Sequence, residues 1–118
     1  MADKYLVNCA YGTDNPEKAT IAFILAFASS KSAETAVFAT AGAASLFCED
    51  NAPDIHAEGY EPINGLIDGY IENGGKIWVC PACAKAKGIT QEDLIHGVEI
   101  AGAPKTMDYL ASGGMTLI

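Results

Sequence analysis

The sequence contains no arginine, and its seven lysines are set against 15 acidic residues, which gives a formal net charge of −8. Nucleic-acid affinity depends on clustered positive charge that neutralises phosphates. Because no basic stripe runs through this chain, we expect no nucleic-acid partner. The acidic surplus indicates solubility and influences the choice of partner, but it does not indicate a fold.

Long hydrophobic runs are also missing. The longest apolar run, residues 21–28, is far shorter than the roughly 20 residues that a membrane-spanning helix needs. Residues 1–4 lack the basic and apolar regions of a signal peptide. We therefore expect no membrane span and a cytoplasmic location. The length of 118 residues suits one hydrophobic core, so residues 1–118 are expected to form a single domain.

Cysteines are few, with four in the chain, while half of the residues are hydrophobic. Disulfide frameworks belong to loop-rich chains with little core, so reduced thiols are the better expectation here. Tetrahedral zinc sites usually combine two cysteine pairs, and Cys9, Cys48, His56 and His96 show no second paired spacing. We expect neither a metal nor a cofactor.

Short apolar runs alternate with helical patterns along the chain. Strands are expected at residues 5–10, 35–40, 76–80, 98–100 and 115–118. Helices are expected from Pro16 to about Ser30, from Pro62 to Asn73, from Cys80 to Gly88, from Thr90 to His96 and from Pro104 onward, with a weak helical turn at residues 42–47. This alternation predicts an α/β fold of βαβ units with right-handed crossovers and a parallel sheet covered on both faces.

The segment Cys80-Pro81-Ala82-Cys83 lies where an expected strand passes into a helix. The first turn of a helix offers free N–H groups and a partial positive charge, and both favour thiolate over thiol. Pro81 suits the first helical position. Both cysteines could instead be small buried hydrophobic residues. A pair at this spacing between strand and helix favours redox or sulfur chemistry.

A second segment is expected at the same edge, because ligands of open parallel sheets lie beyond the carboxyl ends of the strands. The candidate substrate-pocket residues that follow the first strand are Tyr11, Gly12, Thr13 and Asn15. Turn formation and helix capping also explain Asn15. Cys9 approaches Cys80 only if the first and third strands are neighbours, and the sequence leaves this open.

The order of these elements resembles the DsrE/DsrF-like sulfur-relay family, which includes the TusD-type carriers. The resemblance covers nearly the whole chain and rests also on Ala10-Tyr11-Gly12-Thr13 and on a strand-ending cysteine followed by a helix that closes in Lys87-Gly88-Ile89. It implies a three-layer α/β/α domain with a five-stranded parallel sheet, assembled as a trimer or, less favoured, a hexamer. It also implies that Cys80 accepts sulfur as a transient persulfide, but it identifies neither donor nor acceptor.

The chain departs from the carrier pattern at Cys83, where TusD-like sequences have no thiol. A thiolate one helical turn from a persulfide can attack its inner sulfur, form a Cys80–Cys83 disulfide and release sulfide. A carrier would lose its sulfur in this way, so either Cys83 is turned away and buried, or this chain performs persulfide reduction or dithiol redox chemistry. The resemblance itself implies a sulfurtransferase-like sulfur carrier rather than a turnover enzyme. One alternative is a dithiol/disulfide oxidoreductase or persulfide reductase that uses both cysteines, and another is a non-catalytic oligomeric binding protein.

Overall fold

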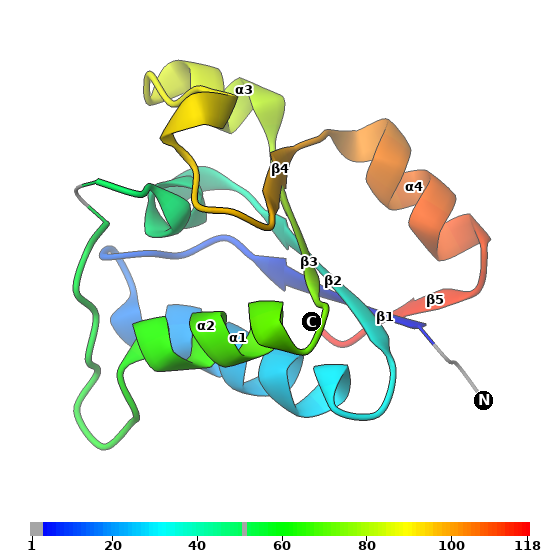
Figure 1. Ribbon diagram of the computed structural model, residues 1–118, viewed down its shortest axis with the longest axis horizontal. Coiled ribbons are helices and arrows are strands. Elements are labelled where there is room, and N and C mark those ends of the chain that lie inside the picture. The colour runs from blue at the N-terminus through cyan, green and yellow to red at the C-terminus, as the bar shows by residue number, and fades with distance from the viewer. Residues whose placement is uncertain (1–3, 51) are drawn as a thin grey trace.

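A five-stranded parallel sheet forms the centre of the computed structural model, which describes residues 4–50 and 52–118 (Figure 1). The strands are β1 (Lys4–Cys9), β2 (Glu34–Ala39), β3 (Lys76–Val79), β4 (Val98–Ile100) and β5 (Gly114–Thr116). The helices are α1 (Pro16–Ser30), α2 (Ile63–Glu72), α3 (Pro81–Ala86) and α4 (Ala103–Ala111), with the 3-10 segments η1 (Ala41–Phe47) and η2 (Gln91–Asp93). Residues 1–3, which entered the expectation about a signal peptide, lie outside the described residues.

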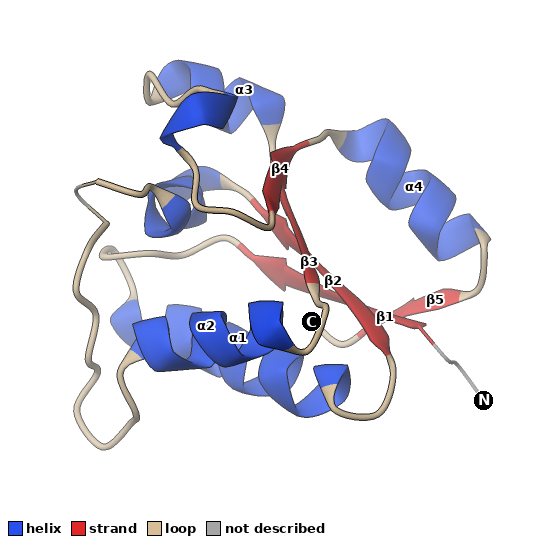
Figure 2. Cartoon of the chain, viewed as in Figure 1, coloured by secondary structure: helices blue, strands red, loops and turns tan. Residues whose placement is uncertain are grey.

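The strand order is β4-β3-β2-β1-β5, and every described pairing is parallel. The chain advances one strand at a time from β1 to β4, and α4 then returns it across the sheet to β5. Since parallel crossovers are right-handed, a connection that runs backward must cross on the opposite face. Figure 2 shows α1 and α2 on one face of the sheet and α4 on the other. The expected three-layer α/β/α architecture is confirmed.

The two faces of the sheet bury unequal cores. Neighbouring residues of a strand point to opposite faces, so Val7 and Val37 enter the larger core with α1 and α2, whereas Leu6 packs with Trp78 and Tyr109 in the smaller one. We call the face that buries the smaller core the α4 face. Among the described residues, the nine-residue helix α4 is the helix that packs over this face, and it covers the face in part (Figure 2).

Local signals place the first helix as expected. The Asn15 side chain accepts a hydrogen bond of 3.1 Å from the Lys18 N–H, and Pro16 occupies the first helical position.

At the other end of the chain, strand β5 stops at Thr116, two residues before the expected end at residue 118. The Leu117 N–H nevertheless still donates to the Leu6 carbonyl of β1 at 2.9 Å.

The expected helix from Thr90 to His96 is a single 3-10 turn that ends at Asp93. Its capping box is present, with Thr90 N–H donating to Asp93 Oδ2 at 2.8 Å. Gln91 then binds β4 through both ends of its side-chain amide. Its Nε2 donates to the Val98 carbonyl at 2.7 Å, and its Oε1 accepts from Ile100 N–H at 2.8 Å. The chain therefore turns into β4, and the expectation of a helix that reaches His96 is wrong.

Within residues 4–50 and 52–118, no helix combines the length and the apolarity that a membrane crossing requires.

Candidate functional site

Cys80 lies directly after β3 and is the N-cap residue of α3. Its backbone N–H donates to the Ala39 carbonyl of β2 at 2.9 Å, and its carbonyl accepts from the Ala84 N–H of α3 at 2.9 Å. Pro81 occupies the first helical position, as the sequence predicts. The sheet and the helix thus fix the backbone of Cys80 from both sides, while the side chain stays partly exposed.

The surroundings of Cys80 favour its anionic form. The backbone N–H of Cys83 has the largest effect and lowers the pKa of the Cys80 thiol. Burial, the second-largest effect, raises this pKa, while the Cys83 thiol and the Ala82 N–H lower it further, so the net pKa shift is downward. The Cys80 side chain makes no capping hydrogen bond to α3, and the N–H groups of Ala82 and Cys83 are the backbone groups that favour its thiolate. Because the thiolate is the nucleophile, a lowered pKa favours the reactivity of Cys80.

Cys83 lies one turn further along α3 and faces the loop that follows β2. The backbone N–H of Ala41 donates to Cys83 Sγ at 3.2 Å. Ala41 has a φ of +48°, and among the residues that the structure describes no other non-glycine residue has a positive φ. Cys83 is half-buried, but its thiol reaches both Ala41 and Cys80 and is not turned away from the site.

The other two cysteines are less acidic than an ordinary thiol. Burial raises the pKa of Cys9 to about 11, and burial together with the nearby Asp93 carboxylate raises the pKa of Cys48. Strand β2 separates β1 from β3, so Cys9 does not approach Cys80 through neighbouring strands. The ionisation of these thiols therefore favours Cys80 as the nucleophile over Cys9 and Cys48.

The four residues expected to line a substrate pocket have different surroundings. Thr13 lines a cavity of about 480 Å³ together with Gly42, Ser45 and Lys87. Asn15 caps α1, and the ring of Tyr11 lies 5.2 Å from the Lys18 ammonium. A Cβ on Gly12 would overlap the carbonyl oxygen of Gly42, so Gly12 holds two backbone segments in contact. A substrate contact by any of the four stays a prediction.

A second cavity, of about 440 Å³, adjoins the first at the same edge of the sheet, and Ser45 and Lys87 line both. Its remaining lining includes Cys48 and the carboxylates Glu49, Asp50, Glu92 and Asp93. Within the described part of the chain, no three His, Cys, Asp or Glu side chains are placed to hold a metal ion.

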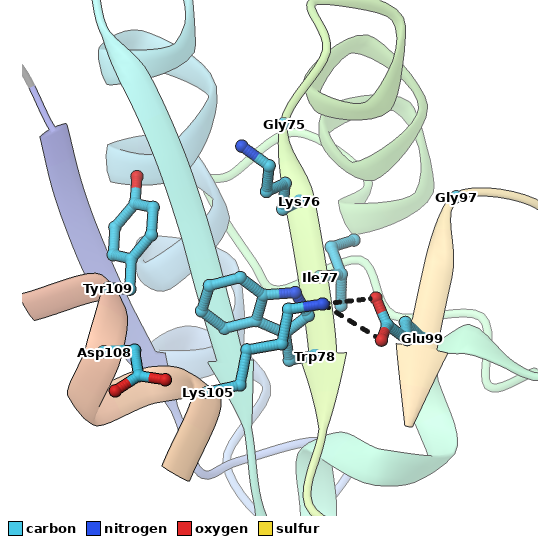
Figure 3. A pocket seen from close by; sticks show the side chains of 9 residues that line it. All are labelled: Gly75, Lys76, Ile77, Trp78, Gly97, Glu99, Lys105, Asp108 and Tyr109. Carbon is cyan, nitrogen blue, oxygen red and sulfur yellow. Dashed lines mark hydrogen bonds and ion pairs between the residues drawn. The ribbon is translucent and has the colours of Figure 1, made fainter. Parts of the chain in front are cut away.

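A third cavity, of about 520 Å³, lies on the α4 face and is lined by neither Cys80 nor Cys83 (Figure 3). Trp78 and Tyr109 form its apolar part, with ring centroids 5.3 Å apart. Lys105 reaches across Trp78, 5.5 Å above the ring, and binds Glu99 at 2.9 Å. The sequence reasoning missed this cavity, although the apolar stretch around Trp78 and the brevity of the last helical pattern indicate an open sheet face.

Ala41 was missed as well. Alanine rarely adopts a left-handed backbone, and its hydrogen bond to Cys83 joins residues 42 positions apart, so no local signal reveals it.

Comparison with solved structures identifies proteins that share this fold. The ychN protein from E. coli superposes with a TM-score of 0.77 at 20% identity over 99% of this chain and 100% of its own. MTH1491 from Methanobacterium thermoautotrophicum gives a TM-score of 0.68 at 14% identity over 97% of this chain and 96% of its own. At these identities the likeness concerns the fold alone.

Two archaeal proteins are similar in sequence. The uncharacterized protein MJ0760 of Methanocaldococcus jannaschii is 31% identical over 108 residues, which are 91% of this chain and 39% of that protein. The uncharacterized protein MK0008 of Methanopyrus kandleri is 44% identical over 36 residues, 30% of each chain. The chain thus spans about two-fifths of the length of the first relative and less than a third of the second. The model of the DsrE/DsrF-like family matches residues 3–117, and the chain belongs to this family.

Proposed function

We propose that this chain accepts sulfur as a persulfide on Cys80 and passes it to an acceptor protein. The DsrE/DsrF-like family is generally related to sulfur relay. The observation that carries the proposal is the partly exposed Cys80 thiol between β3 and α3, whose pKa is lowered chiefly by the Cys83 N–H. A thiol of this kind forms the thiolate that attacks sulfur in exchange reactions.

Loading is a single displacement. The Cys80 thiolate attacks the outer sulfur of a donor persulfide, so that a bond forms between Cys80 Sγ and that sulfur while the sulfur–sulfur bond of the donor breaks. The donor leaves as a thiolate with the electron pair, and the proton stays on the transferred sulfur. The N–H groups of Ala82 and Cys83 stabilise negative charge on Cys80 before the attack. Unloading is the same displacement with the acceptor thiolate as nucleophile.

Dithiol–disulfide exchange is the second candidate function. It is favoured by the Ala41 N–H that binds Cys83 Sγ at 3.2 Å, because this contact places the second sulfur beside Cys80. A Cys80–Cys83 disulfide with a reduction potential in the range of thiol oxidoreductases, about −120 to −270 mV, would support this candidate over simple carriage.

We also propose that residues 1–118 act as one domain in a cytoplasmic homo-oligomer, a trimer rather than a hexamer. Reduced cysteines support the cytoplasmic location. Charge supports association through the α4 face. Three lysines on this face balance three carboxylates, so the rest of the molecule carries the whole net charge of −8. The charged residues of this face are Lys4, Lys76, Lys105, Glu34, Glu99 and Asp108. Like-charged copies repel one another least where the surface is neutral.

Sedimentation equilibrium tests this association. We expect the wild-type protein to sediment as an oligomer and Lys105→Glu to shift it toward the monomer. Lys85→Glu makes the same charge change on α3 and is expected to leave the oligomer intact. A monomeric wild-type protein would refute the oligomer, and equal sedimentation of both variants would refute the α4 face as the interface.

The sulfur proposal is tested by loading the reduced protein with an organic persulfide and locating the added sulfur by mass spectrometry after alkylation. Trypsin cleaves after Lys76 and Lys85, which leaves Cys80 and Cys83 on one peptide. Cys83→Ser therefore assigns the sulfur unambiguously, and Cys48→Ser is the matched control at a second partly exposed cysteine. We expect one added sulfur atom at Cys80 in Cys83→Ser, one in Cys48→Ser when alkylation follows loading at once, and none in Cys80→Ser. Added sulfur only at Cys9 or Cys48 would overturn the assignment.

A further inference from the structure

The backbone around Ala41 is fixed from several directions. Thr40 N–H donates to the Cys9 carbonyl at the end of β1 at 2.9 Å, and Ala43 N–H donates back to the Thr40 carbonyl at 2.9 Å. On the far side, Gly42 packs directly against the backbone of Gly12. These contacts hold Ala41 in a left-handed conformation that residues with a Cβ avoid, and they aim its N–H at Cys83 Sγ.

Cys83 lies between this donor and Cys80. Its sulfur accepts the Ala41 N–H at 3.2 Å, and its thiol is close enough to Cys80 to favour the Cys80 thiolate. An inert cysteine on a helix needs neither contact, because a thiol packs as a small hydrophobic group. A strained backbone that binds a sulfur atom is typical of a functional site.

We propose that Cys83 resolves the Cys80 persulfide with release of hydrosulfide, and that Ala41 is the positioning residue whose N–H holds the attacking sulfur. The inference rests on the proposed function of Cys80. It adds a second fate for the bound sulfur. The sulfur passes to an acceptor when one is bound, and Cys83 releases it as hydrosulfide when none is.

The step balances within the pair. The Cys83 thiol gives its proton to solvent, and the thiolate attacks the inner sulfur of the persulfide, which is Cys80 Sγ. A bond forms between the two Sγ atoms, the bond from Cys80 Sγ to the outer sulfur breaks, and the outer sulfur leaves as hydrosulfide with the electron pair. The two cysteines are oxidised to a disulfide and the transferred sulfur is reduced. An external dithiol then returns the pair to the reduced state.

The N–H of Ala41 acts on Cys83 when its sulfur attacks the persulfide as a thiolate. An N–H at 3.2 Å stabilises a thiolate more than a thiol, because hydrogen bonds to a charged acceptor are stronger. The same bond restrains the Cys83 side chain on the side of Cys80, and a positioned intramolecular thiol outcompetes thiols in solution.

The decisive experiment compares wild-type protein with Cys83→Ser after stoichiometric loading with an organic persulfide and removal of small thiols. We expect the wild-type protein to release about one equivalent of hydrosulfide and to form the Cys80–Cys83 disulfide. The Cys83→Ser protein should retain its persulfide about tenfold longer or more, since no neighbouring thiol can attack. Equal persulfide lifetimes overturn the inference while leaving the Cys80 assignment intact. A Cys83→Ser protein that takes no sulfur at Cys80 overturns the proposed function itself.

The role of Ala41 is tested through its N–H alone. Replacing the amide between Thr40 and Ala41 by an ester removes this donor and changes little else. We expect the ester to slow hydrosulfide release while sulfur loading at Cys80 proceeds at the wild-type rate, because the Cys83 sulfur is no longer held beside Cys80. If the ester releases hydrosulfide at the wild-type rate, Ala41 does not position Cys83.

Discussion

Gly12→Ala tests the backbone contact that supports the Ala41 turn. Gly12 has no positive φ, so the added methyl group causes no backbone strain of its own. Its Cβ would overlap the Gly42 carbonyl oxygen and lie 3.1 Å from the carbonyl carbon. Carbon atoms pack at about 3.5–4.0 Å, so the two segments must separate by roughly 0.4–0.9 Å. Forced repacking of this kind costs about 1–3 kcal/mol.

Urea unfolding measures this cost. We expect Gly12→Ala to lower the free energy of unfolding by about 1–3 kcal/mol. Gly65→Ala is the matched control, because Gly65 lies in α2 without a positive φ, and nothing lies within 4 Å of the place that its new methyl group would take. Alanine is the better helix former, so this variant should gain about 0.5–1 kcal/mol. A Gly12→Ala protein as stable as the wild type would refute the close-packing argument.

The same substitution has a second consequence at the site. If Ala41 moves with Gly42, its 3.2 Å hydrogen bond to Cys83 Sγ lengthens toward or beyond the usual limit. Hydrosulfide release by Gly12→Ala should then be slower than in the wild type while sulfur loading at Cys80 is retained. Unchanged release in a protein that is destabilised as expected would show that the turn does not control Cys83.

Two further predictions concern buried polar groups. The Tyr70 hydroxyl lies 2.9 Å from the Thr35 carbonyl and 2.7 Å from the Lys76 carbonyl and shares its one proton between them. Tyr70→Phe should therefore lower the free energy of unfolding in urea by about 1–3 kcal/mol, and an unchanged value would contradict this. Burial raises the pKa of Cys9 to about 11, so the unfolded chain loses this proton near pH 9 while the folded chain keeps it. Stability should therefore fall by about 2–3 kcal/mol between pH 9 and pH 11 relative to Cys9→Ala; parallel pH curves for the two proteins would disprove the burial argument.

Much of the fold could be predicted because its signals are local. Asn15 and Pro16 fix the start of α1 through a side-chain cap and a preset φ, and these act within one turn. The apolar run before Cys80 and the proline after it likewise place this cysteine between strand and helix. Alternation of strands and helices was sufficient to predict a parallel sheet.

The rest depends on contacts between distant segments. Strand order separates Cys9 from Cys80, and no short-range pattern encodes it. The capping box at Thr90 forms as its sequence indicates, but Gln91 binds β4 with its side-chain amide and the turn stops at Asp93. The hydrogen bond between Ala41 and Cys83 arises only when β2 and β3 lie side by side, so the sequence could show two thiols but not how the second is held.

The central claim is that the fold lowers the pKa of Cys80 and keeps its thiol within reach of solution. It is tested most directly by the pH profile of Cys80 alkylation in the folded Cys83→Ser protein, measured beside an unstructured peptide of residues 76–88 with the same substitution. The backbone N–H of residue 83, the largest influence on this thiol, is kept in the variant. We predict that the folded protein reaches its half-maximal alkylation rate at a lower pH than the peptide. Coincident profiles, or a Cys80 that iodoacetamide does not reach, would contradict the account and favour a non-catalytic binding protein.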